Sequence, residues 1–67
     1  MDIVEEAKKL RDSMEFAHIT LKNKRFHNGQ IMEVRNDFLI INDEKFGEMP
    51  IFFSEVNSIY PRIPKNS

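Results

Sequence analysis

Three basic residues lie within four positions of one another: Lys22, Lys24 and Arg25, with His27 two residues further on. Cations spaced this closely can contact phosphates, and each neutralised phosphate adds salt-dependent affinity for nucleic acid. Charged hairpins also protect the sheet edges of small β proteins and keep them in solution. The sequence leaves both interpretations open for this segment, residues 22–25, which we name the basic hairpin.

Composition limits the other functions that the chain can have. With 10 basic and 11 acidic residues the net charge is −1, so nucleic-acid binding would depend on a local patch. His18 and His27 have no suitably spaced partner, and two glycines are too few for a phosphate-binding loop. The acidic cluster Asp43, Glu44 and Glu48 matches no calcium-loop spacing. We therefore expect no catalytic residue, no cofactor and no metal site.

The elements that position these residues can be read from the hydrophobic pattern. Apolar residues recur at spacings of four, three, four and three and predict an amphipathic helix over about residues 2–13, with Asp2 and Glu5 in a capping-box arrangement. This stripe consists of Ile3, Ala7, Leu10, Met14 and Ala17. Residues 16–21 then alternate as a half-buried strand, and 22–25 form a tight turn.

Four further strands are expected. Residues 26–34 form one long strand that bends at Gly29, and the apolar run 38–41 is typical of a strand covered on both faces. A loop at 42–48 precedes a strand at 49–53, a tight corner at Ser54 and Glu55, and a strand at 56–60. Prolines end the ordered structure and leave a short tail at 62–67. The expected fold is mainly β, a single domain over 1–67 with an N-terminal helix and a five-stranded, strongly bent antiparallel barrel over 16–61.

The size of the chain favours self-association. A 67-residue domain buries only about 60% of its unfolded surface, and with no cysteine it has no disulfide to supplement the core. Oligomerisation is the favoured supplement. The first residues lack the features of a signal peptide and no apolar run approaches a membrane span, so we expect a cytoplasmic protein without a membrane partner.

The segment from Leu21 to Val34, LKNKRFHNGQIMEV, resembles the first half of an Sm-type barrel, an SH3-like fold found in Sm, LSm and archaeal relatives, bacterial Hfq and some phage proteins. Leu21 and Asn23 match the family's turn, and Gly29 matches its fixed glycine, followed by Gln30 and Ile31. Lys24 stands where the family has the turn glycine. The ending from Phe52 to Pro61 is similar to that of Hfq. The resemblance covers roughly residues 16–61.

This resemblance implies a ring of roughly five to seven identical subunits that binds single-stranded RNA, such as an RNA chaperone. The family's base-binding loops correspond to Arg35, Asn36, Asp37 and Phe38, and to Phe53, Ser54 and Glu55. Phe38 could stack a base, Asn36 could bond its edge, and Arg35 could meet a phosphate, with the basic hairpin as a further phosphate contact. Most of the family's base-reading residues are replaced here, and these positions also fit an ordinary turn followed by a core strand.

The resemblance also implies that subunits join through the fourth and fifth strands. The expected interface residues are apolar or aromatic: Ile51, Phe52, Phe53, Val56, Ile59 and Tyr60. An alternative function is a structural or protein-interaction ring that has lost RNA recognition. Asp37 and Glu55 favour this alternative because both would repel phosphate.

Overall fold

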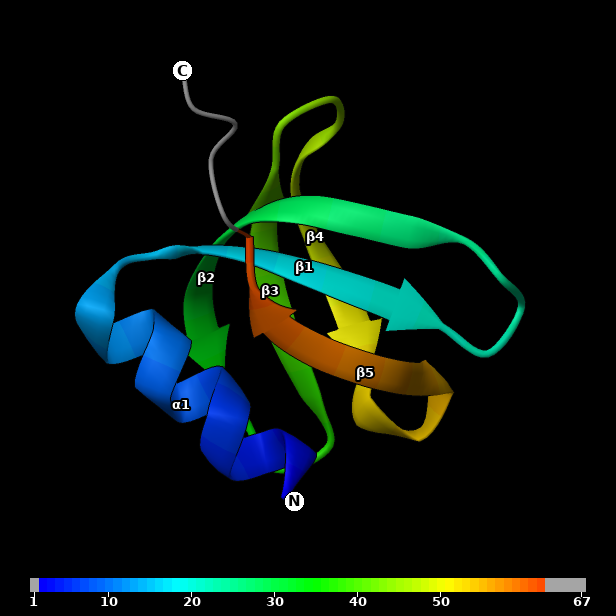
Figure 1. Ribbon diagram of the computed structural model, residues 1–67, viewed down its shortest axis with the longest axis horizontal. Helices are drawn as coiled ribbons and strands as arrows, with labels where there is room; N and C mark the ends of the chain where they lie inside the picture. Colours follow the sequence, from blue (N-terminus) through cyan, green and yellow to red (C-terminus); the bar gives the residue numbers. More distant parts are fainter. Residues whose placement is uncertain (1, 63–67) are drawn as a thin grey trace.

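The computed structural model describes residues 2–62 and consists of one helix followed by five strands (Figure 1). The elements are α1 (Ile3–Ser13), β1 (Phe16–Leu21), β2 (Phe26–Val34), β3 (Phe38–Asp43), β4 (Gly47–Phe52), a 3₁₀ turn η1 (Phe53–Glu55) and β5 (Val56–Pro61). The strands form one antiparallel sheet in the order β4-β3-β2-β1-β5, whose edges β4 and β5 do not pair with each other. The predicted fold class is confirmed, although the sheet is not closed. Of the predicted tail, residues 63–67 lie outside the described part.

Helix α1 begins and ends as the sequence predicts. The Asp2 carboxylate accepts the Val4 backbone N–H at 3.0 Å, and Met14 ends the helix in the left-handed conformation with φ 60°. Ala7 and Leu10 are buried. Met14 is a correction to the predicted apolar stripe, because its side chain is 69% exposed. The left-handed residue stops the helix, so Met14 no longer follows the helical periodicity that the stripe assumes.

The turn between β1 and β2 uses local hydrogen bonds. Asn23 accepts the Arg25 backbone N–H with its side-chain oxygen at 2.9 Å, and Lys24 donates its own backbone N–H to the Leu21 carbonyl at 3.0 Å. Lys24 has φ 73°, a left-handed conformation that favours glycine. Lys24 stands where the family has a glycine, and its backbone has a conformation that glycine adopts more easily than other residues.

Gly29 lies where β2 contacts both of its neighbours, opposite Ala17 of β1 and Asp43 of β3. A Cβ at this position would lie 2.0 Å from the Asn42 carbonyl oxygen, so only glycine fits. Strand β2 also has a register shift against β3, between Ile31 and Glu33. Gly29 is required for close approach of the β3 backbone.

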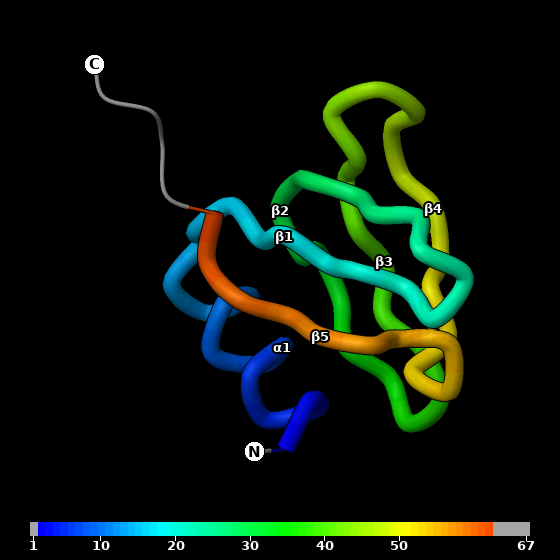
Figure 2. The backbone as a smooth tube through the Cα atoms, turned by 45° about the vertical axis from the view of Figure 1, so that its right-hand side comes forward, coloured from blue at the N-terminus to red at the C-terminus, as the bar shows by residue number. Residues whose placement is uncertain are grey.

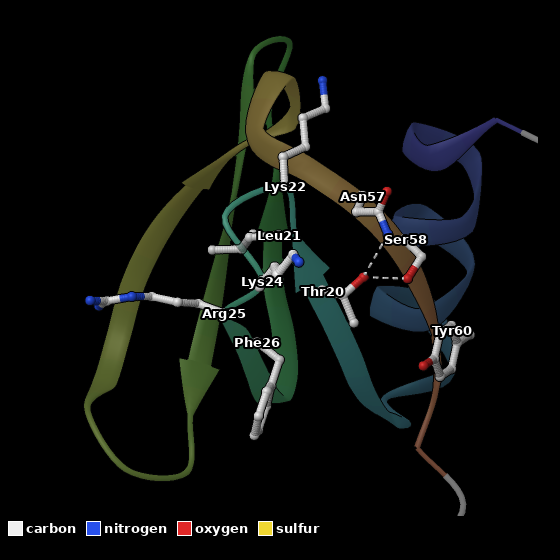
Figure 3. A pocket seen from close by; sticks show the side chains of 9 residues that line it. All are labelled: Thr20, Leu21, Lys22, Lys24, Arg25, Phe26, Asn57, Ser58 and Tyr60. Atoms are coloured by element: carbon white, nitrogen blue, oxygen red, sulfur yellow. Dashed lines mark hydrogen bonds between the residues drawn. The ribbon is translucent and has the colours of Figure 1, made fainter.

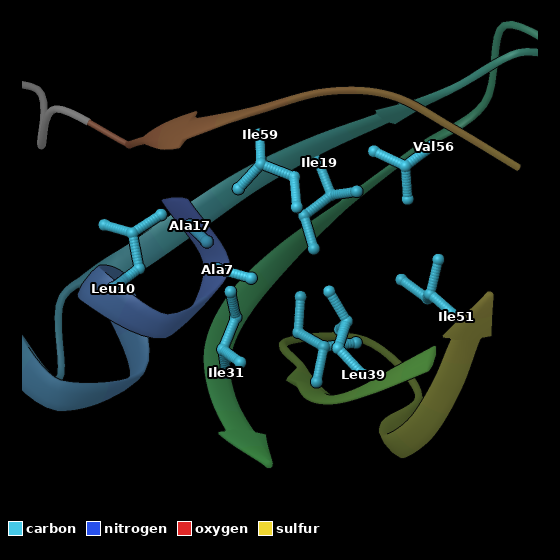
Figure 4. Packing of buried hydrophobic residues seen from close by; sticks show 10 residues of the cluster. Ala7, Leu10, Ala17, Ile19, Ile31, Leu39, Ile51, Val56 and Ile59 are labelled. Carbon is cyan, nitrogen blue, oxygen red and sulfur yellow. The ribbon is translucent and has the colours of Figure 1, made fainter. Parts of the chain in front are cut away.

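The sheet curls so that β1 and β5 cross over β3 and β4, with the core between them (Figure 2). Helix α1 packs against β2 and β5 at one end of this core. The buried apolar side chains come from the helix and all five strands: Ala7, Leu10, Ala17, Ile19, Ile31, Leu39, Ile41, Ile51, Val56 and Ile59 (Figure 4). Within residues 2–62, no helix has the length and apolar character needed to cross a membrane.

Two predictions about apolar residues are corrected by this core. The resemblance places Ile51, Val56 and Ile59 at a subunit interface, but their side chains are at most 4% exposed because the curled sheet turns them inward. Strand β3 was expected to be covered on both faces. Its inner face is buried, whereas Phe38 and Ile40 on the outer face are only partly covered.

Candidate nucleic-acid interface

The basic hairpin borders an open hollow of about 580 Å³, formed by β1, β5 and the start of β2 (Figure 3). We name it the hairpin hollow. Its lining combines the three cations with polar and aromatic side chains: Thr20, Leu21, Lys22, Lys24, Arg25, Phe26, Asn57, Ser58 and Tyr60. The backbone N–H of Lys22 donates to the Glu55 carbonyl at 2.9 Å, which fixes the hairpin to the 3₁₀ turn.

The cations of the basic hairpin are exposed and have no acidic partner in the described part of the chain. Within residues 2–62, none of Lys22, Lys24 and Arg25 forms an ion pair, whereas Lys8, Lys9, Arg11, Arg35 and Arg62 all do. The side chains of Lys22 and Arg25 extend in different directions from the turn (Figure 3). Three unpaired cations on one turn can therefore meet an anionic ligand without first breaking an internal contact.

The side of the hollow on β1 and β5 carries hydroxyl and amide groups. Thr20 Oγ1 and Ser58 Oγ lie 2.5 Å apart, and Asn57 Nδ2 donates to Thr20 Oγ1 at 3.4 Å. Such groups provide both donors and acceptors for a polar ligand. They face outward because their strand neighbours Ile19 and Ile59 occupy the core.

Three aromatic rings cross the outer face of β2, β1 and β5 next to the hollow. His18 lies between Phe26 and Tyr60, with ring centroids 5.4 and 5.3 Å apart, and its Nδ1 is 2.6 Å from Asn28 Oδ1. Phe26 and Tyr60 are 56% and 47% exposed. We name these three residues the aromatic row. Exposed rings beside unpaired cations form a surface on which bases can stack while their phosphates are neutralised.

Sequence reasoning missed the aromatic row. The alternation in residues 16–21 does place His18 on the outward face. Phe26 and Tyr60, however, lie 34 positions apart in the sequence, on β2 and β5. The row exists because β1 lies between β2 and β5 in the sheet. The alternation pattern of a single sequence does not show this order.

The loops implied by the family resemblance do come together. The Phe53 backbone N–H donates to the Asp37 carbonyl at 2.9 Å, which joins residues 35–38 to the 3₁₀ turn. Asn36, Asp37, Ser54 and Glu55 are all exposed. The other three residues are less available to a ligand, and one of them, Phe53, packs partly against the core. Arg35 is bound to the Glu33 carboxylate at 2.6 Å, and Phe38 is partly buried with its ring edge to face with Phe52 at 5.8 Å.

A mainly apolar groove of about 390 Å³ runs along the outer face of β3 and β4 beside these loops. It is lined by Phe38, Ile40, Glu48, Met49, Pro50 and Phe52. We name it the β3–β4 groove. Of the residues expected at a subunit interface, Phe52 is 50% exposed in this groove and Tyr60 is exposed on β5, while Phe53 packs partly against the core.

His27 does not join the basic hairpin as suggested by its position in the sequence. Its Nδ1 lies 3.0 Å from Oδ1 of Asp43, a buried carboxylate that also accepts the backbone N–H groups of Lys45 and Phe46. Burial alone would raise the pKa of Asp43, but these two backbone bonds and His27 together lower it. Asp43 therefore fixes both the β3–β4 turn and the orientation of His27.

The described residues contain no group of three or more His, Asp or Glu side chains that could hold a metal ion. No family model and no curated protein matches the sequence.

Proposed function

We propose that this protein is an Sm-like, single-stranded-RNA-binding protein that acts as a homo-oligomer of roughly five to seven subunits. The observation that carries the proposal is the hairpin hollow, where three unpaired cations border exposed Phe26 and Tyr60. Single strands are bound by this combination because aromatic rings stack unpaired bases and cations follow the backbone. The local charge matters because the chain as a whole has a net charge of −1.

Three local features support the Sm-like part of the proposal. An N-terminal helix followed by five strands in one curled antiparallel sheet is the topology that the resemblance implies. Lys24 has a left-handed backbone where the family has glycine. Gly29 lies against the Asn42 carbonyl at the family's fixed glycine position, where no Cβ fits.

The edges of the sheet support assembly. Strands β4 and β5 each have one side without a strand partner in the described chain, and an unpaired edge is a template for pairing with another copy. Phe52 and Tyr60 add exposed aromatic surface on these two strands. Pro50 removes one backbone donor from β4, which edge strands tolerate. Closing a ring through these edges would enlarge the small core of the monomer.

The test is a fluorescence-anisotropy titration with labelled oligo-U and oligo-A at about 50 and 200 mM salt, next to light scattering of the free protein. We expect a mass several times 8.0 kDa and an affinity that falls with salt with a log–log slope near −2, about 0.7 for each hairpin cation. A monomer at micromolar concentration would contradict the assembly. An intact oligomer that binds neither oligonucleotide at low salt would contradict RNA binding.

A second function, a ring that binds proteins and not RNA, is favoured by the β3–β4 groove and the loops beside it. The β3–β4 groove is mainly apolar, Arg35 is paired with Glu33, and Asp37 and Glu55 add exposed negative charge. An intact oligomer without RNA affinity would decide for this function.

A further inference from the structure

A second hollow, of about 350 Å³, lies between the start of β2 and the β3–β4 turn. We name it the turn hollow. Phe26 lines both this hollow and the hairpin hollow, so the two surfaces are continuous across one exposed ring. The other lining residues that matter here are His27, Lys45, Phe46 and Arg62.

Two exposed phenylalanines line the turn hollow. Phe46, in the β3–β4 turn, is 73% exposed, and Phe26 is 56% exposed. The Phe46 ring meets the His27 ring nearly edge to face, with centroids 6.4 Å apart. A phenylalanine this exposed gains little from folding, so its large apolar surface remains available to a ligand. Base-to-ring stacking is the interaction that such a surface offers to a single strand.

His27 supplies a directed polar group beside the Phe46 ring. Because its Nδ1 faces the Asp43 carboxylate at 3.0 Å, the ring proton of the neutral form lies on Nδ1 and Nε2 is an acceptor. Nε2 makes no hydrogen bond within residues 2–62, where every buried polar side-chain atom has a partner. Nε2 is therefore at the surface, held in place by the same carboxylate that fixes the turn.

Most charged groups that line the turn hollow are already paired, and the remaining charge is positive. Lys45 is exposed and forms no ion pair with any residue between 2 and 62. Arg62 is paired with Glu44 at 2.9 Å, and Asp43 is occupied by His27 and two backbone N–H groups. Lys45 is thus the free cation of the turn hollow.

We propose that the turn hollow is a second nucleotide-binding subsite for single-stranded RNA, reached from the hairpin hollow across Phe26. One base stacks on Phe46, a donor on its edge bonds to Nε2 of His27, and the adjoining phosphate meets Lys45. This inference rests on the proposed function, since it extends the same bound strand. It adds a base-contacting residue, Phe46, that lies outside both loops implied by the family resemblance.

The experiment compares Phe46→Ala with the wild type in anisotropy titrations against an oligoribonucleotide of about 12 nucleotides, long enough for both hollows. The matched control is Phe16→Ala, another exposed phenylalanine on the sheet that lines neither hollow. We expect Phe46→Ala to weaken binding at least fivefold and Phe16→Ala to leave it unchanged, since one stacked base contributes about 1–3 kcal/mol. Melting temperatures of both variants verify that the fold is intact.

Two further measurements test the polar contacts. Lys45→Gln should lower the salt slope by about 0.7, and the His27 imidazole signals in NMR should shift when the oligonucleotide is added. Wild-type binding that Phe46→Ala leaves unchanged, with His27 signals that do not move, would overturn the turn hollow as a subsite while the proposed function stands. Absence of any binding by the wild type would overturn both proposals.

Discussion

The two outer surfaces of this small sheet differ in how their charges are used. Around the hairpin hollow, Lys22, Lys24 and Arg25 form no ion pair within residues 2–62, and two exposed rings lie beside them. Around the β3–β4 groove, Arg35 is held by Glu33 at 2.6 Å, and Phe38 is engaged by Phe52. Within residues 2–62 the cations of the basic hairpin form no ion pair, whereas Arg35 beside the groove is paired and its neighbours Asn36 and Asp37 stay exposed.

This difference shows that a resemblance in sequence indicates which positions could bind a ligand. It does not show whether the side chains at those positions are free to bind one. The resemblance directs attention to residues 35–38 and 53–55, and these do meet through the bond from Phe53 to Asp37. Arg35 and Phe38 are the two residues of these loops best suited to RNA, but both already contact other side chains, Glu33 and Phe52. The contacts favour the hairpin surface for RNA and leave the groove better suited to a protein.

The largest effect should come from Gly29, whose backbone pairs with Ala17 of β1 on one side and with Asp43 of β3 on the other. Gly29→Ala places a Cβ 2.0 Å from the Asn42 carbonyl oxygen, and the backbone must separate. We expect a loss of about 3 kcal/mol or more in the free energy of unfolding, measured by urea denaturation.

Gly47→Ala is the matched control for this change. Its φ of 80° makes alanine unfavourable, but an added Cβ there would have nothing within 4 Å. It should cost only about 1 kcal/mol. Equal losses for the two variants would show that the contact at Asn42 is not what requires glycine at position 29.

A smaller effect is expected at Asp43, which fixes the turn beside the second hollow. Asp43→Asn removes charge-assisted hydrogen bonds from Lys45, Phe46 and His27 and should lower the free energy of unfolding by about 2 kcal/mol at pH 7.

The effect should depend on pH in a defined direction. The folded-state pKa of Asp43 is below its ordinary value of 3.8, so its contribution is complete above pH 3.8 and is lost as pH falls through the folded-state pKa. The difference in the free energy of unfolding between wild type and Asp43→Asn should therefore be largest at neutral pH and should narrow as the pH falls below 3.8. A difference that does not narrow in acid would show that the charge of Asp43 is not the stabilising feature.

Features of the fold that depend on neighbouring residues could be predicted from the pattern, whereas several contacts between distant strands could not. Asp2 at the helix start and the alternation of Ala17 with His18 depend on neighbouring residues, and both predictions are confirmed. Whether Ile51 and Val56 are buried or exposed depends on how far the sheet curls, and no local sequence pattern determines this. The pairing of His27 with Asp43 likewise requires β2 and β3 to lie side by side, so spacing alone placed His27 with the wrong partners.

The contrast between the two surfaces can be tested by removing cations from each. Lys24→Gln with Arg25→Gln should lower RNA affinity about tenfold, or about 1.4 kcal/mol, and reduce the salt slope by about 1.4. Arg35→Gln should change neither quantity much, because Glu33 already neutralises that guanidinium. The reverse result, with Arg35 dominant, would move the RNA site to the loops that the family resemblance implies.

The smallest effect separates the structural and electrostatic roles of Lys24. A residue with a side chain loses about 1–2 kcal/mol in the left-handed region, and glycine loses about 0.5–1 kcal/mol in entropy, so Lys24→Gly should stabilise the fold by about 0.5 kcal/mol. The same change should reduce the salt slope of RNA binding by about 0.7. Lys24→Ala serves as control, because it removes the cation but keeps the strained backbone and should lower the slope without raising the melting temperature. If Lys24→Gly raised stability but left the slope unchanged, Lys24 would be a turn residue only, and the phosphate contacts of the basic hairpin would reduce to Lys22 and Arg25.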